Sequence, residues 1–164
     1  MTQRVSSRPK AKRASEPPLD PRASPFRLRI ARSAIHGWGL FAAQRIPPGR
    51  IVIKYQGKRM SLRQFLANLR QIRKRGGRMP RYVIRVSEDW FVDGSIGGCG
   101  AERINHSCDP NLRMREVAHR AVFVSRRWIR DGEELTWDYR FRRTAPRRPC
   151  HCGSANCRGS MNRK

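Results

Sequence analysis

The spacing of hydrophobic residues indicates a succession of short strands. Leu28 and Ile30 alternate with Arg27 and Arg29, the period-two pattern of a half-buried strand. Further strands are expected where apolar runs lie between turns that contain glycine, proline or aspartate, at residues 40–43, 51–55, 82–86, 90–92, 120–128 and 134–139. Many short strands predict a mainly β fold.

One segment has a helical period instead. Between Ser61 and Arg75, apolar residues recur three or four positions apart, Ser61 is suited to cap the N-terminus, and Gly76 follows the end. The opposite face carries Arg63, Arg70, Arg73 and Lys74. Such a face is typical of an ordinary solvated helix, and it also suits a basic ridge that contacts a polyanion.

Residues 1–25 are rich in Arg, Ser, Pro and Lys and have almost no large apolar side chains, which predicts disorder. We therefore expect a disordered basic tail at 1–25, a folded domain at 26–145 and a cysteine-containing segment at 146–164. No apolar run approaches the roughly 20 residues needed to span a membrane. No apolar segment follows the N-terminal charges, so a secretory signal is not expected.

The formal net charge of +25, mostly from arginine, predicts acidic partners such as nucleic acid, contacted through an Arg-rich surface. A GC-rich genome that favours Arg codons would give the same composition without selection for binding.

The cysteines indicate a metal site. An odd count of five suits a reducing, intracellular compartment better than a disulfide scaffold. Three local thiols plus one distant thiol are a common layout for structural zinc. The fourth ligand is expected to be Cys108, with His151 as the alternative, and disulfides or an iron–sulfur cluster are the other interpretations. Cys99 is left over. The three local thiols are Cys150, Cys152 and Cys157.

The loop from Asn105 to Asn111 places amide, imidazole and thiol groups side by side between extended runs, where functional residues tend to lie. Taken alone, other candidates are weak. The paired glycines Gly37 and Gly39 would allow a ligand to approach the backbone, but they equally suit a plain hairpin turn. Tyr139, at the end of a strand, is by itself most often a core residue.

Together, and in this order, these segments resemble the SET-domain protein-lysine methyltransferases that carry a C-terminal post-SET zinc segment. The similar motifs are residues 35–41, 105–111, 134–139 and the Cys150-x-Cys152-x4-Cys157 tail. The resemblance covers residues 26–160. It implies a SET β-fold with a C-terminal pseudoknot, one short amphipathic helix and a zinc-bound post-SET tail.

The resemblance also implies roles for single residues. Tyr139 and Tyr82 would be catalytic, Trp137 would line the substrate channel, and S-adenosyl-L-methionine would be the methyl donor. Structural Zn²⁺ would be held by Cys108, Cys150, Cys152 and Cys157. The implied cofactor-binding residues are Gly37, Trp38, Gly39, Tyr82, Arg103, Asn105, His106 and Tyr139.

The implied activity is methylation of a lysine on a histone-like tail or another basic DNA-associated protein. The expected location is the nucleus or chromosome in a eukaryote, and the cytoplasm or a secreted effector in a bacterium. Two positions depart from the family pattern. Lys54 stands where many members have an acidic residue, and Glu102-Arg103 stands where many have Arg and an aromatic residue. The alternative function is that of a catalytically weak, basic module, stabilised by bound zinc, that binds nucleic acid or chromatin.

Overall fold

The computed structural model describes residues 15–163 and confirms a mainly β fold with one α-helix, α1 (Leu62–Lys74). Short 3-10 turns occur at Pro21–Ala23 and Ala101–Arg103. The strands are β1 (Leu28–Arg32), β2 (Trp38–Ala42), β3 (Ile51–Lys54), β4 (Lys58–Ser61), β5 (Val83–Arg85), β6 (Trp90–Asp93), β7 (Asn105–His106), β8 (Leu112–Val117), β9 (Arg120–Ser125) and β10 (Thr136–Trp137).

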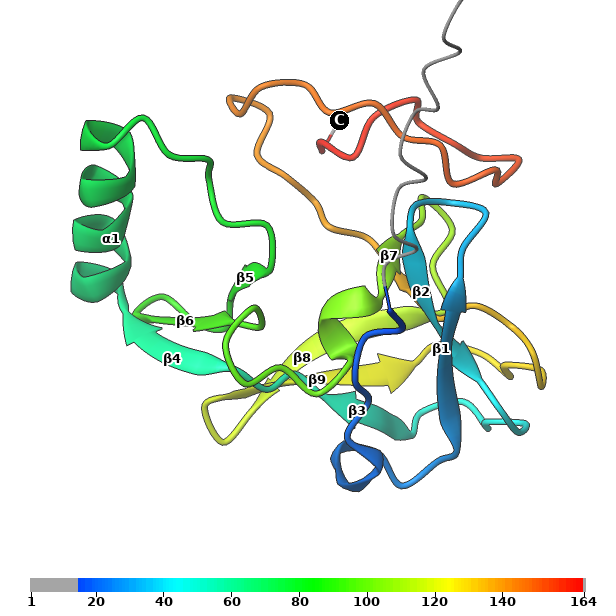
Figure 1. Cartoon of the computed structure of the whole chain (residues 1–164). Helices are drawn as coiled ribbons and strands as arrows, with labels where there is room; N and C mark the ends of the chain where they lie inside the picture. Colours follow the sequence, from blue (N-terminus) through cyan, green and yellow to red (C-terminus); the bar gives the residue numbers. More distant parts are fainter. Residues whose placement is uncertain (1–14, 164) are drawn as a thin grey trace, which may run out of the picture.

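The strands form four small sheets (Figure 1). β1 and β2 are an antiparallel hairpin, β3-β9-β8 and β4-β6-β5 are three-stranded antiparallel sheets, and β10 pairs with β7 in parallel. The segment after β10, orange to red in Figure 1, passes over the end of the molecule where β7 and β2 lie. The shortest pairing, β7 with β10, therefore lies beneath the C-terminal tail.

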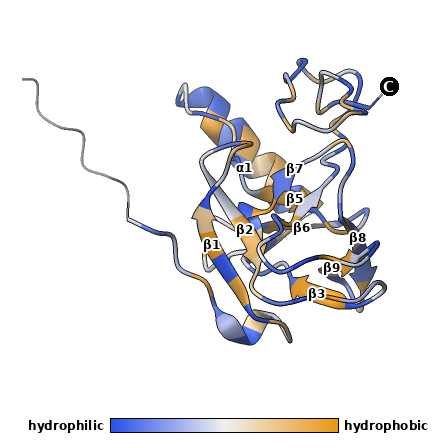
Figure 2. Cartoon of the chain, turned by 90° about the vertical axis from the view of Figure 1, so that its right-hand side faces the viewer, coloured by the Kyte–Doolittle hydropathy of each residue, from blue (hydrophilic) through white to orange (hydrophobic). Residues whose placement is uncertain are grey.

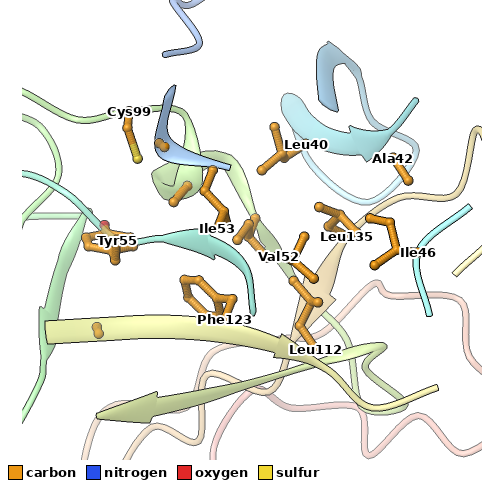
Figure 3. Packing of buried hydrophobic residues seen from close by; sticks show 14 of the residues in the cluster. Leu40, Ala42, Ile46, Val52, Ile53, Tyr55, Cys99, Leu112, Phe123 and Leu135 are labelled. Carbon is orange, nitrogen blue, oxygen red and sulfur yellow. The ribbon is translucent and has the colours of Figure 1, made fainter. Parts of the chain in front are cut away.

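The main core lies between the β1-β2 hairpin and the inner face of β3-β9-β8 (Figure 3). Leu40, Ile53, Phe123 and Leu135 are fully buried in it. Figure 2 shows hydrophobic colour concentrated on β3 and β9. Apolar side chains from distant segments thus fix the β2, β3 and β10 regions relative to one another.

The predicted helix is confirmed. Ser61 accepts a hydrogen bond from the Gln64 N–H, and the Gln64 side chain accepts one from the Ser61 N–H, which is a capping box. Phe65 stacks on Phe91 of β6, with ring centroids 4.2 Å apart. No helix among the described residues is long and apolar enough to cross a membrane.

Ordered packing begins before the domain boundary that we expected at residue 26. Leu19 packs against the core, Ala23 is buried, and the Asp20 N–H donates to the Cys99 carbonyl. These two apolar side chains anchor the short Pro21–Ala23 turn, whose first N–H groups Asp20 caps. The remaining part of the predicted tail, residues 1–14, lies outside the described residues.

Several elements differ from the sequence prediction. β4 and β8 were not predicted, and β7 occupies two residues of the segment expected to be a loop. The strand expected at 134–139 is shortened to β10. Outside β10, the segment is held by an isolated bridge between Phe41 and Glu134 and by side-chain hydrogen bonds, and not by continuous strand pairing.

Candidate functional site

The site is built where two distant segments cross. β7 and β10 pair in parallel, with Asn105 opposite Thr136 and His106 opposite Trp137. Asn111 extends the contact: its Nδ2 donates to the Glu134 carbonyl at 2.8 Å, and its Oδ1 accepts from the Thr136 N–H at 2.9 Å. These bonds join the two segments that the predicted pseudoknot would bring together.

Asn105 connects this crossing to residues 36–39. Its Nδ2 donates to Glu134 Oε1 at 2.8 Å and lies 3.2 and 3.3 Å from the carbonyl oxygens of His36 and Trp38. Ser33 Oγ donates to the same carboxylate at 2.8 Å. A buried amide, a hydroxyl and a carboxylate thus orient the backbone after His36.

Gly37 and Gly39 are required in this segment for different structural reasons. Gly37 has a φ of +54°, in the left-handed region, with open space where a Cβ would stand. Gly39 is buried, and a Cβ there would collide with the Glu134 carboxylate. The first glycine permits the turn, and the second makes room for Glu134.

The Tyr139 ring packs against three other aromatic rings. Its ring centroid lies 5.3 Å from that of His106, 5.2 Å from Trp137 and 5.6 Å from Phe141. Its hydroxyl donates to the Ile104 carbonyl at 2.9 Å. Burial raises the pKa of Tyr139, with smaller contributions from Tyr82 and Glu134, so the hydroxyl is neutral near pH 7.

The His106 ring orients this tyrosine. His106 Nδ1 accepts a hydrogen bond from the Tyr139 backbone N–H at 3.1 Å, so that nitrogen is unprotonated. Burial lowers the pKa of His106, although the Asp138 carboxylate opposes that shift. A neutral imidazole therefore joins β7 to the end of β10.

Tyr82 has an unusual partner. Its hydroxyl accepts a hydrogen bond from Arg103 Nη1 at 3.0 Å, and the guanidinium carbon lies 5.0 Å from the centre of its ring. Tyr55 fixes the same segment, because its hydroxyl donates to the Tyr82 carbonyl at 2.7 Å. Arg103 Nε is buried and has no hydrogen-bond partner within residues 15–163. It lies 3.6 Å from Glu102 Oε1, so this N–H already faces a carboxylate of the chain.

The cysteine cluster is assembled as predicted. The Sγ atoms of Cys108, Cys150, Cys152 and Cys157 all lie within 4.8 Å of one another, and those of Cys108 and Cys150 are 3.7 Å apart. A tetrahedron with metal–sulfur bonds of about 2.3 Å has sulfur–sulfur edges of about 3.8 Å. The geometry therefore fits a metal that prefers four thiolates.

Backbone N–H groups point at these sulfurs. The N–H groups of Cys108, Arg158 and Gly159 donate to the sulfurs of Cys152, Cys108 and Cys157, respectively. Burial disfavours the charged thiolate, but N–H donors from Cys108 and Ser154 prevail and lower the pKa of Cys152 to about 6. Burial instead raises the pKa of Cys108 and of Cys150, so the N–H groups favour a thiolate at Cys152 in particular. His151 is exposed and outside the cluster, and Cys99 is buried elsewhere as a free thiol.

A partly buried ion pair holds the tail against the crossing of β7 and β10. Arg158, directly after Cys157, donates from Nη1 and Nη2 to the two Asp138 carboxylate oxygens at 3.0 and 2.7 Å. Asp138 Oδ1 also lies 3.6 Å from His106 Nδ1. Asp138 lies between Trp137 and Tyr139 in the sequence. The Arg158–Asp138 ion pair therefore connects the cysteine cluster to the aromatic side chains around Tyr139.

Replacing Arg158 with lysine should loosen this connection. Lysine keeps the charge but cannot make the two parallel bonds. We expect the free energy of unfolding to fall by about 1 kcal/mol, with most of that loss absent in an Asp138→Asn background, as a double-mutant cycle in chemical denaturation would measure. Metal content should stay unchanged. Additive effects of the two substitutions would contradict the pairing.

The structure groups the candidate residues into one region. Asn105 reaches residues 36–38, His106 contacts Tyr139, and Tyr82 lies close enough to influence the Tyr139 pKa. The sequence analysis did not single out Ser33, Asp138 or Arg158, since their partners lie far away in the chain. The only local signal was that Asp138 belongs to the Glu134–Tyr139 motif.

Comparison with known proteins identifies relatives. The model of the SET domain matches residues 37–140. The histone-lysine N-methyltransferase SETD1B of Xenopus tropicalis is 38% identical over 141 residues, which cover 83% of this chain and 7% of that protein. The human SETD1B has the same identity and coverage. A histone-lysine N-methyltransferase of Chaetomium globosum, described as H3 lysine-4 specific, is 39% identical over 143 residues, 82% of this chain and 13% of the relative.

Proposed function

The chain belongs to the SET-domain family, and on that premise we propose that it transfers methyl groups from S-adenosyl-L-methionine to a lysine side chain of a histone or another basic protein. The chain spans 7% to 13% of the length of the relatives described above, so activity and substrate are inferred for the matched region. The observation that carries the proposal is the convergence of Asn105, His106 and Tyr139 at the crossing of β7 and β10.

The donor groups of the site suit the cofactor. The open left-handed turn at Gly37 and the carbonyls of His36 and Trp38 offer acceptors for an ammonium group, to which Asn105 adds an amide oxygen. The Arg103 guanidinium, whose Nε makes no hydrogen bond but lies 3.6 Å from Glu102 Oε1, offers a charged donor for a carboxylate. We assign the methionine end of the cofactor to these residues, and its adenine end to the region of His106.

Bound S-adenosyl-L-methionine supplies an electrophilic methyl group on a sulfonium. The protein must align the lysine amine and present it neutral. An apolar channel walled by Trp137 and Tyr139 would disfavour the ammonium form, whose pKa is about 10.4 in water. The Tyr139 hydroxyl and the Ile104 carbonyl that it contacts are polar groups that can orient the amine.

The cysteine cluster is assigned a structural Zn²⁺. Four thiolates leave no open coordination position for a reacting water, so the metal would stabilise the fold and not enter the reaction. Its role would be to hold the tail against β7 and Asp138, which encloses the site.

The substrate class follows from the names of the relatives and from charge. A histone-like tail bound to nucleic acid, at the nucleus or chromosome of a eukaryote or in the DNA-containing cytoplasm of a bacterium, would bring a lysine to the site. The +25 charge repels a free basic tail. Contact of the Arg-rich surface with the nucleic acid would offset that repulsion.

The proposal is tested by incubating the purified protein with isotopically labelled S-adenosyl-L-methionine and histones or a nucleic-acid-associated protein fraction. Mass spectrometry should find labelled methyl groups on lysine. Label on arginine or on no protein would contradict it.

A binding module without catalysis is the second candidate, favoured by the Glu102-Arg103 departure and the charge. Calorimetry separates the two functions, because an enzyme must bind S-adenosyl-L-methionine and a pure binding module has no need to do so.

Trp137 should control the number of methyl groups added. Its ring packs between Phe123 and Tyr139, with centroids 5.3 and 5.2 Å away, and its indole N–H can only donate a hydrogen bond. The resemblance implies Tyr or Phe at the matching position of the family, where a phenol would hold a water that restricts the amine. We expect the wild type and Trp137→Phe to give di- or trimethylated peptide, and Trp137→Tyr to stop earlier, as measured by mass spectrometry. The same methyl count at matched turnover in all three would exclude this role.

A further inference from the structure

The outer face of the β3-β9-β8 sheet is cationic on all three strands. Strand register places Lys54 of β3, Val122 of β9 and Arg115 of β8 in one row. The next row holds Ile51, Val124 and Arg113, and the row at the turn holds Val117 and Arg120. Residues directly opposite each other in antiparallel strands project from the same face. We call these four cations the basic sheet face: Lys54, Arg113, Arg115 and Arg120.

This face points away from the main core. Leu112, Ala121 and Phe123, which project from the other face, belong to the core cluster. Val122 and Val124 lie outside that cluster but are also buried, at 3% and 6% exposure. The four cations are exposed, as are Ile51 at 40% and Val117 at 47%. The acidic residue Glu116 has the opposite parity and pairs with His119. No carboxylate therefore lies in the three rows.

The cations of this face are not used by the fold. Within residues 15–163, none of the four side chains makes a hydrogen bond, an ion pair or a contact over an aromatic ring. Some other arginines are engaged: Arg158 is paired with Asp138, Arg127 with Glu133, and Arg59 lies over Trp90. Among the described residues, Arg63, Arg70 and Arg73 on α1 are exposed and unpaired like the basic sheet face. Four exposed, unneutralised charges on a rigid sheet form a preorganised site for a polyanion.

The β8-β9 turn makes the end of this face narrow and rigid. Its central residues Ala118 and His119 have φ of +48° and +57°, as in the two-residue turns that match strand twist. Neither is glycine, so the turn keeps side chains at a position that costs about 1–2 kcal/mol per residue. In Figure 1 it lies at the lower edge of the molecule, away from the C-terminal tail.

We propose that the β8-β9 hairpin and its basic sheet face bind duplex nucleic acid through the phosphate backbone. A two-stranded ribbon has the dimensions of an element that enters a major groove. Arg113 and Arg115 emerge about 7 Å apart along one strand, with Arg120 beside them at the turn. The exposed Val117 lies among these charges and contributes apolar contact.

Binding of nucleic acid to the basic sheet face is independent of the proposed catalysis. Only its effect on the encounter with a protein substrate rests on the proposed function. Anchoring on nucleic acid would hold the enzyme beside basic proteins that are bound to the same polyanion. The repulsion between a +25 chain and a free basic peptide would then no longer limit the encounter.

The test compares two variants of the full chain with equal charge change. One is the triple variant Arg113→Gln/Arg115→Gln/Arg120→Gln. The other is Arg63→Gln/Arg70→Gln/Arg73→Gln on the exposed face of α1. Fluorescence anisotropy with a short mixed-sequence DNA duplex, over a range of salt concentrations, gives affinity and salt slope. Thermal unfolding and methylation of a free histone peptide are measured for both.

The sheet variant should weaken duplex binding at least about tenfold at low salt and reduce the slope of log Kd against log salt by about 2 to 3, because each phosphate contact contributes about 0.9. The α1 variant should change affinity by less than about twofold. Equal losses in both variants, or no loss in the sheet variant, would overturn the assignment. The assignment would also be overturned if the sheet variant lost binding to phosphatidylserine vesicles but kept its binding to the duplex. Peptide methylation should be unchanged in the sheet variant, so failure of the proposed enzyme activity would appear separately.

Discussion

Tyr139→Phe is expected to reduce the rate of methyl transfer by about 100- to 1,000-fold, the usual effect of removing one oriented polar group from a reaction site. The packing should survive, because phenylalanine keeps the ring contacts with His106, Trp137 and Phe141. The lost bond to the Ile104 carbonyl should cost about 1 kcal/mol of stability. Single-turnover kinetics with labelled cofactor would measure the rate, and calorimetry should find cofactor affinity retained.

Tyr55→Phe is the matched control. Tyr55 is buried and, like Tyr139, donates its hydroxyl to a backbone carbonyl. Because that carbonyl belongs to Tyr82, Tyr55 positions a site residue but is not itself assigned a contact with the substrate. It should lose similar stability and keep most of its turnover. If both variants lost the same activity, the Tyr139 hydroxyl would have only a structural role.

The pH dependence should come from the substrate. Burial raises the pKa of Tyr139, so its hydroxyl stays protonated across an assay between about pH 7 and 9. The rate should then rise with pH as the lysine amine loses its proton.

Cys108→Ser should abolish metal binding and release the tail. The purified protein should contain one equivalent of zinc, and the variant none. Residues 145–163 depend on the cluster because site formation and ordering of the tail are coupled. Their amide hydrogens should exchange faster, as hydrogen-exchange mass spectrometry would record, and activity should fall by at least about tenfold.

Cys99→Ser provides the comparison. Cys99 is a buried thiol outside the cluster, and its Sγ donates to the Lys54 carbonyl, a bond that a hydroxyl can also make. It should keep its zinc. A Cys108→Ser protein that is free of metal and yet fully active, with an ordered tail, would show that the cluster does not support the site.

Local periodicity was sufficient to predict β1 and α1. Leu28 and Ile30 alternate with exposed arginines, and the Ser61-Gln64 pair caps a regular apolar spacing. β8 was missed because the turn that follows it contains Ala118 and His119 instead of the glycine or asparagine expected at positive φ. Turn chemistry that contradicts the backbone conformation hides a hairpin from sequence reasoning.

The candidate site, like the fold, was only partly predictable from the sequence. Motif order and cysteine spacing identified the Asn105–Asn111 segment and the four thiols, and their proximity is confirmed. The contacts that orient them were not predictable. Glu134 reaches Asn105, and Arg158 reaches Asp138, only because the chain crosses itself, and no local pattern encodes that crossing.

The parallel pairing of β7 with β10 also sets an order of events as the chain folds. The β8-β9 hairpin lies between these strands in the sequence and closes through a two-residue turn, so it can form early. β10 must then find β7 across that hairpin, a non-local step that is slow for its size. Cys108 and Asp138 acquire their final positions only afterwards. We therefore expect the proposed zinc to be captured last and the four thiols to stay open to oxidation until then. The yield of folded protein would then depend on zinc supply and redox state during synthesis.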